Sequence, residues 1–92
     1  MDELLLSKIR LGAVAELLNY DWIAFSELAR ALDASNGNLG AHLAKLVEAG
    51  YVDEEKSFAN RRPLTRYRLT PRGRAAFAAH VAQLQSLLGA AK

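Results

Sequence analysis

Residues 35–52, SNGNLGAHLAKLVEAGYV, are the stretch that decides the fold predicted from this sequence. Ser35 is a residue type that caps helix N-termini, and Gly50 stands where a left-handed residue commonly ends a helix. Between them, apolar residues recur at helical spacing, at Leu39, Leu43, Leu46 and Val47. This pattern predicts an amphipathic helix with one buried face and a definite start and end.

The opposite face of this helix carries the side chains that determine its role. A helical wheel places six residues away from the leucines: Gly37, Asn38, Ala41, Ala44, Lys45 and Glu48. Asparagine can bond an adenine edge, lysine can reach phosphate or guanine, and glycine leaves room for close approach. We therefore predict a DNA-reading helix with the candidate contacts Ser35, Asn36, Gly37, Asn38, Gly40, Ala41, His42 and Lys45. A poorly formed first turn is the alternative, since each internal glycine costs about 1 kcal/mol relative to alanine.

The residues before this helix predict its companion in a helix-turn-helix. Residues 2–19 repeat apolar positions at helical spacing and predict a first helix. An apolar connector with Trp22 and Phe25 follows, and Ser26 is expected to cap a helix of about two turns. Asp33 and Ala34 then form a turn into the helix that begins at Ser35. Two helices joined in this way form a helix-turn-helix, although a helical hairpin without a DNA role has the same pattern.

The residues after Gly50 predict a β-hairpin and a final helix. An extended segment begins at residue 51, a turn falls within residues 57–63, and residues 65–69 alternate polar and apolar as a strand does. The candidate DNA contacts on this hairpin are Lys56, Arg61, Arg62 and Arg66, although an exposed, solvated loop is also rich in arginine. Thr70 is expected to cap the last helix, with Pro71 in its first position.

The first and last helices carry more apolar residues than one buried face needs. Three leucines stand in a row near the N-terminus, and the last helix has a seam of coiled-coil-like spacing. We predict that these helices form a homodimer interface through Leu4, Leu5, Leu6, Ile9, Phe77, Val81, Leu84 and Leu88. A well-anchored N-terminus within one protomer is the alternative for the leucine run.

Composition bounds the class of protein. The chain of 92 residues predicts a single domain spanning 1–92, and it contains no cysteine. All ten acidic residues lie between Asp2 and Glu55, whereas eight of the twelve basic residues lie from Lys56 onward. This asymmetry predicts a basic surface offered to a polyanion, unless it is only a solvated face. No run approaches the ~20 apolar residues of a membrane span, so we expect a cytoplasmic protein without a membrane partner.

Catalysis and metal binding find no support in the sequence. No nucleophile motif or glycine-rich phosphate loop is present, and we predict that the protein is not an enzyme. His42 and His80 stand far apart on different helices, so we predict no metal site and no cofactor. His42 lies at the side of the helical wheel, where packing or a phosphate contact is expected. The sequence does not identify a small-molecule effector.

Two segments carry a resemblance to a known family. SNGNLGAHLAKLVEAGYV from Ser35 and KSFANRRPLTRYRLTPRGRAAF from Lys56 resemble the small MarR/ArsR-type winged-helix transcriptional regulators. The resemblance implies a mainly α fold with a small β-hairpin, in which the N- and C-terminal helices form the dimer interface. It also implies a sequence-specific regulator of double-stranded DNA, with the helix from Ser35 in the major groove and the hairpin as the wing on the backbone or minor groove. We expect a repressor, because so small a domain has no room for an activation module.

This sequence departs from the family pattern at two positions of the helix. Gly40 stands where relatives often carry serine, and Ala44 stands where a basic residue is frequent. Both changes remove a possible phosphate or base contact, so operator preference cannot be carried over. The alternative function is therefore a winged-helix module that binds another protein and has lost DNA binding.

Overall fold

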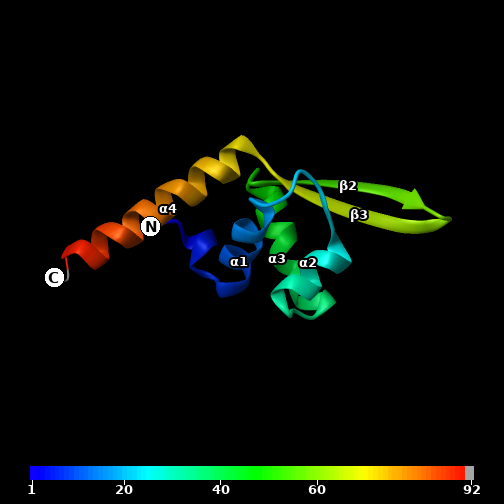
Figure 1. The fold of residues 1–92 in the computed structure, drawn as a ribbon, viewed down its shortest axis with the longest axis horizontal. Coiled ribbons are helices and arrows are strands. Elements are labelled where there is room, and N and C mark those ends of the chain that lie inside the picture. The colour runs from blue at the N-terminus through cyan, green and yellow to red at the C-terminus, as the bar shows by residue number, and fades with distance from the viewer. Residues whose placement is uncertain (91–92) are drawn as a thin grey trace.

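The computed structural model describes residues 1–90 and has the order of elements that defines a winged helix (Figure 1). The elements are the 3₁₀ helix η1 (Glu3–Leu6), α1 (Lys8–Leu17), β1 (Ile23–Ala24), α2 (Phe25–Leu32), α3 (Asn36–Glu48), β2 (Val52–Ala59), β3 (Arg62–Leu69) and α4 (Pro71–Ala90). The strands form an antiparallel sheet in the order β1-β3-β2. The predicted mainly α fold with a β-hairpin is confirmed. No helix in this part of the chain is long and apolar enough to cross a membrane.

The predicted helix from Ser35 is present with both of its end signals. The hydroxyl oxygen of Ser35 accepts a hydrogen bond from the Asn38 amide at 3.3 Å. At the other end Gly50 has a φ of 80°, and the amides of Gly50 and Tyr51 donate to the carbonyls of Val47 and Leu46. This pair of bonds is a Schellman motif, which satisfies carbonyls left free at the end of α3.

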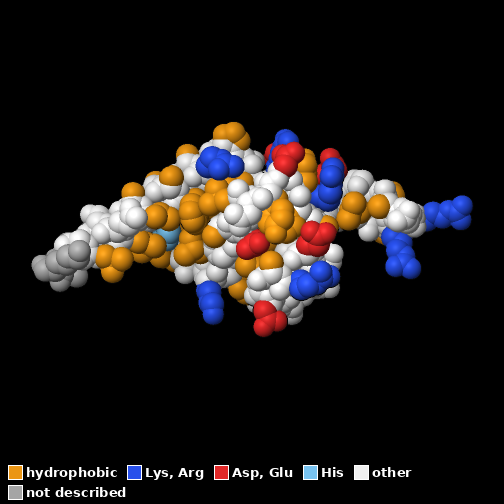
Figure 2. Space-filling view, viewed as in Figure 1, with side chains coloured by type: hydrophobic (Ala, Val, Ile, Leu, Met, Phe, Trp, Pro, Cys, Tyr) orange, Lys and Arg blue, Asp and Glu red, His pale blue; other side chains and the backbone are white. Residues whose placement is uncertain are grey.

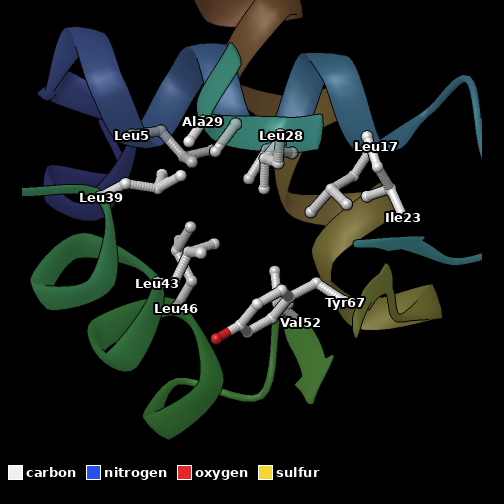
Figure 3. Packing of buried hydrophobic residues seen from close by; sticks show 12 residues of the cluster. Leu5, Leu17, Ile23, Leu28, Ala29, Leu39, Leu43, Leu46, Val52 and Tyr67 are labelled. Carbon is white, nitrogen blue, oxygen red and sulfur yellow. The ribbon is translucent and has the colours of Figure 1, made fainter. Parts of the chain in front are cut away.

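One hydrophobic core joins the helices to the sheet (Figure 3). Leu39, Leu43 and Leu46 form the buried face of α3, and they lie against side chains of the first two helices and of the sheet. Leu5 belongs to this core and has 0% exposure. Its assignment to the dimer surface is therefore wrong, because its side chain is already enclosed within its own protomer.

The single first helix predicted for residues 2–19 is in fact two elements. Ser7 has an extended backbone between η1 and α1, and its side chain accepts from the Arg10 amide at 3.3 Å. Asp2 likewise caps η1 by accepting from the Leu4 amide at 3.0 Å. Two local caps therefore divide a segment whose apolar spacing alone indicates one continuous helix.

The segment before α2 contains a strand that the sequence did not predict. Ile23 and Ala24 pair with Tyr67 and Arg66 of β3, so the apolar connector is the third strand of the sheet. Because Ala24 stays extended in this pairing, it becomes the residue before the helix, and Ser26 lies inside the first turn. The predicted Ser26 cap is therefore wrong, and no side chain caps α2.

The hairpin is longer and its turn is tighter than predicted. β2 and β3 pair from Val52–Leu69 to Ala59–Arg62, which leaves only Asn60 and Arg61 in the turn. Both turn residues have positive φ, 51° and 64°. This is the conformation of a type I′ turn, whose twist matches that of the flanking strands. The hairpin projects from the body as a wing (Figure 1).

The last helix begins as predicted and then leaves the body of the protein. The Thr70 hydroxyl oxygen accepts from the Gly73 amide at 3.0 Å and donates to the Gly50 carbonyl at 2.6 Å. Gly73 is buried against the backbone of Tyr51, where a Cβ atom would lie 2.1 Å from the carbonyl oxygen. The distal half of α4 extends beyond the other helices, at the end of the molecule opposite the wing (Figure 1).

Candidate nucleic-acid interface

The outer face of α3 is open to solvent and lacks bulky side chains. Six of the eight predicted contacts on this helix are exposed: Ser35, Asn36, Gly37, Asn38, Ala41 and Lys45. The other two, Gly40 and His42, are half-buried on opposite flanks of the helix. A Cβ atom added at Gly37 or Gly40 would meet nothing within 4 Å, so packing inside the protein does not require either glycine.

Among the predicted contacts on α3, His42 is the one held by another side chain. Its Nδ1 lies 2.8 Å from Nη1 of Arg10, which comes from α1. Burial, followed by the charges of Arg10 and Lys45, lowers the pKa of His42 below its ordinary value of 6.5. The imidazole is therefore favoured in its neutral form, in which one ring nitrogen donates and the other accepts.

The outer end of the wing gathers exposed cations and an exposed ring. We use "wing tip" for residues 58–63, which include Arg61, Arg62 and the cross-strand pair Phe58–Pro63. The side chain of Phe58 is 76% exposed, the largest value among the exposed large apolar residues. Lys and Arg side chains project from this end of the molecule (Figure 2). The wing tip thus combines positive charge with an apolar surface.

Further down the wing, the basic residues are engaged with acidic partners across the hairpin. Arg66 forms an ion pair with Glu55, and Arg68 pairs with Asp53 at 3.2 Å. Both guanidinium groups also lie over the Trp22 ring, at 5.1 and 4.6 Å from its centroid. The charge of Arg66 is therefore partly balanced within the protein, whereas the charges of Arg61 and Arg62 at the wing tip are not balanced by an ion pair within residues 1–90.

The other face of the wing is also partly neutralised. Lys56, although mostly exposed, has its Nζ 3.9 Å from a carboxylate oxygen of Glu54. The Tyr67 hydroxyl donates to Glu54 at 2.7 Å, and burial together with this bond raises the Tyr67 pKa. The basic surface expected from the sequence is therefore partly neutralised along the wing below its tip, because β2 supplies acids opposite the arginines of β3.

Two residues of this region were missed from the sequence. Arg10 lies 32 positions before His42, and no local pattern connects them. Phe58 was overlooked because its segment was expected to be a turn, and alternation along β2 becomes visible only once the strand is known to reach Ala59. A register derived from the Asn60–Arg61 turn would have paired Phe58 with Pro63 next to the cationic tip.

The predicted dimer residues lie on η1, α1 and α4, and the distal part of α4 forms the end of the molecule opposite the wing (Figure 1). Leu6 is 60% exposed and Leu88 is 70% exposed, whereas Leu4, Ile9, Phe77, Val81 and Leu84 are half-buried. Leu87, which was not predicted, is also exposed. Residues 75–90 of α4 include no Lys, Arg, Asp or Glu, and Figure 2 shows an apolar and uncharged surface along the distal part of this helix.

No group of three or more potential metal-ligating side chains occurs within residues 1–90. The rings of Trp22 and Phe25 are already in contact with other side chains. The two arginines of β3 cover Trp22, and Phe25 lies 6.2 Å from the Tyr67 ring, centroid to centroid.

Comparisons with known families and structures both identify a winged helix. Residues 9–88 match the family described as the winged helix DNA-binding domain. An uncharacterized protein of Methanocaldococcus jannaschii is 33% identical over 81 residues, which are 88% of each chain. The structure of a transcriptional regulator homologue from Pyrococcus horikoshii OT3 superposes with a TM-score of 0.90 at 27% identity, covering 99% of this chain and 90% of the other. A MarR-family transcriptional regulator from Silicibacter pomeroyi has a TM-score of 0.74 at 26% identity, covering 90% of this chain and 55% of the other.

Proposed function

Because the chain belongs to the winged helix DNA-binding domain family, whose structural neighbours include MarR-family and other transcriptional regulators, we propose that it is a dimeric, sequence-specific repressor. Each protomer places α3 in a major groove of double-stranded DNA and the wing on the adjacent backbone or minor groove. The family is not enzymatic, and the proposed mechanism is occlusion of a promoter. We place this activity in the cytoplasm, because a DNA-binding regulator acts inside the cell.

The observation that carries this proposal is the contrast between the two faces of α3. Leu39, Leu43 and Leu46 are fully buried, whereas the opposite face offers small and polar side chains with nothing covering them. A helix of this kind can enter a groove about 12 Å wide without clashes, and Asn38 and Lys45 are its longest exposed groups that suit nucleic acid. Few bases are therefore read directly, and much of the affinity comes from the wing and from dimerisation.

The wing tip supports backbone or minor-groove contact. Arg61 and Arg62 make no ion pair within the described part of the chain, and both are exposed at the end of a stiff two-stranded ribbon. Arginine is favoured in the minor groove, where the negative potential is enhanced when the groove is narrow. Phe58 and Pro63 beside them add an apolar surface suited to sugar edges or base steps.

The proposed dimer uses the exposed Leu6, Leu87 and Leu88 together with Leu84 and the other half-buried residues predicted for this surface. Exposed leucines on η1 and on α4, without charged residues among those of α4, are unusual for a solitary protomer. A two-fold axis at this end presents two α3 helices to DNA, and half-sites about 34 Å apart are expected. Analytical ultracentrifugation of the wild type and of a Leu87→Ser/Leu88→Ser variant tests the proposed dimer by its mass. A monomeric wild type would count against the dimer.

The central experiment is selection of bound duplexes from a random pool, followed by fluorescence anisotropy at several salt concentrations. We expect a recovered pseudo-palindrome and a log–log salt dependence with negative slope. The variant Arg61→Gln/Arg62→Gln should bind all sequences more weakly and reduce the magnitude of the slope by about 2 per protomer. Arg30→Glu, which changes the net charge by the same two units at an exposed position of α2 outside both the wing and the proposed dimer surface, is the matched control.

Two results would overturn the proposal. Absence of binding to any duplex at low salt would favour the alternative, a module that binds another protein, which is supported by the lack of a polar or basic side chain at Gly40 and Ala44. Equal losses in the wing variant and in the α2 control would remove the wing from the mechanism, because net charge alone would then account for the effect.

A further inference from the structure

Arg10 connects three segments of the chain at the edge of α3. From its place in α1, its Nε donates to the Leu4 carbonyl at 2.6 Å, and its Nη1 lies 2.8 Å from Nδ1 of His42. The guanidinium is therefore fixed at two points, one on η1 and one on α3. Because a guanidinium is planar and rigid, the bond to Leu4 also determines where its second donor points.

The chemistry of this contact decides the protonation of the His42 ring. Arginine has five N–H donors and no acceptor, so Nδ1 of His42 must accept. A neutral imidazole carries a single N–H, which is then on Nε2. An imidazolium would place an N–H of His42 against an N–H of Arg10, so the contact also disfavours the charged ring. The charged groups that act on His42 are Arg10 from α1 and Lys45 from its own helix, and both are cations.

Nε2 of His42 is available to an external partner. Nδ1 of His42 is engaged by Arg10, whereas Nε2 has no hydrogen bond within residues 1–90 and is not among the buried unpaired atoms. His42 follows Asn38 by four residues and precedes Lys45 by three, so the three side chains share one side of α3. This side borders the exposed face that the proposed function turns toward DNA.

We propose that Arg10 is a positioning residue of the DNA interface, which holds His42 in the tautomer that offers an N–H donor from Nε2 to an acceptor on the duplex. The proposal rests on the proposed function and adds a selectivity to it. Phosphate oxygens, the N7 atom of either purine, O6 of guanine and O4 of thymine accept such a bond, whereas the amino groups of cytosine and adenine do not. The N–H of His42 therefore selects against an exocyclic amino group at this position.

The first test examines the ring without DNA. Long-range ¹H–¹⁵N NMR spectra of the full chain report which ring nitrogen of each histidine is protonated, and the signal lost in His42→Phe assigns the residue. In the wild type near neutral pH we expect a single tautomer with the proton on Nε2. Arg10→Met should give a mixture of tautomers and a higher His42 pKa, and Arg10→Lys should restore part of the preference.

The matched control for this test is Arg30→Met, which removes one exposed cation from α2 and should leave the His42 signals unchanged. A wild-type ring protonated on Nδ1, or present as a mixture, would overturn the proposal without any variant. A tautomer unaffected by Arg10→Met would overturn it as well. These readouts do not depend on DNA, so they stand whether or not the proposed function holds.

The second test is a double-mutant cycle on duplex affinity. Loss of one oriented hydrogen bond predicts that Arg10→Met weakens binding by roughly three- to tenfold. In a His42→Phe background the same substitution should have little further effect, because the ring that it positions is gone. Equal losses in both backgrounds would mean that Arg10 acts directly or through the fold, and would refute the positioning role. Absence of binding by the wild type would refute the proposed function instead.

Discussion

Replacing the glycines of α3 by alanine separates the stability of the fold from the fit to DNA. In the free protein a Cβ atom at Gly37 or Gly40 would meet no heavy atom within 4 Å. Alanine is favoured over glycine inside a helix by about 1 kcal/mol, and by less in the first turn. Gly40→Ala should therefore raise the free energy of unfolding by about 1 kcal/mol. In a domain of this size that corresponds to a rise in Tm of roughly 4–8 °C.

The effect on DNA binding should have the opposite sign. If α3 approaches the duplex closely, the new methyl group occupies space that the DNA needs. Forcing a methyl group into a filled contact costs about 1–3 kcal/mol, which corresponds to roughly 5- to 150-fold in affinity. We expect the larger loss for Gly37→Ala, because Gly37 is exposed on the outer face and Gly40 is half-buried on its flank.

Urea denaturation and fluorescence anisotropy on the same samples measure the two effects. Gly89→Ala makes the same chemical change in open space on α4, and it should leave duplex affinity unchanged. A more stable Gly37→Ala protein that binds DNA as well as the wild type would refute the close-approach role of the glycine. A less stable Gly40→Ala protein would show that the space beside this residue is not open.

Four further predictions concern single positions. Gly73→Ala should destabilise the domain by about 3 kcal/mol or more in urea denaturation, because its Cβ would lie 2.1 Å from the Tyr51 carbonyl oxygen. Phe58→Ser should leave the urea midpoint nearly unchanged while weakening duplex binding in anisotropy titrations, because the ring is 76% exposed. Arg66→Gln should lower stability and leave the salt dependence of binding nearly unchanged, since this guanidinium already pairs within the protein. The pKa of His42 is lower in the folded protein than in the unfolded chain, so as the pH falls the unfolded chain takes up a proton on His42 before the folded protein does. The free energy of unfolding should therefore fall as the pH drops through 6.5 and should level off above about pH 7. The variant His42→Phe should remove this contribution in urea denaturation at several pH values.

The parts of the fold that depend on local chemistry could be predicted from the sequence. Ser35, Gly50 and Thr70 act within one turn of their own positions, so their roles follow from residue type and spacing. Ser7 is an equally local cap that was overlooked because the leucines around it suggested continuous periodicity. β1 could not be predicted in this way, since a two-residue strand exists only through its pairing with β3.

The sequence could predict those features of the candidate site that depend on one helix face. It could not predict those that depend on a partner side chain from a distant part of the sequence. Exposure of Asn38 and Lys45 follows from their place opposite the leucines of α3. The neutralisation of Arg66 follows instead from the antiparallel register, which places Glu55 directly across from it. Along the sequence these residues belong to an acidic and a basic segment, and only the hairpin makes them neighbours. The charge asymmetry along the sequence therefore overestimates the charge of the folded surface when an acidic strand pairs with a basic strand.

The charges that remain unpaired have a consequence for how two protomers can combine. The described chain extends 55 Å along its longest axis and only 25 and 21 Å along the others. Cations and the exposed ring of Phe58 occupy one end, and the uncharged distal part of α4 occupies the other (Figures 1 and 2). Joining two protomers through their wings would bring arginines of like charge together and hide the groups suited to phosphate. Joining them through α4 and Leu6 buries the apolar end and leaves both wings outermost. This arrangement allows a two-fold symmetric protein to contact two half-sites, so the segregation of charge along the long axis favours the same dimer as the exposed leucines do.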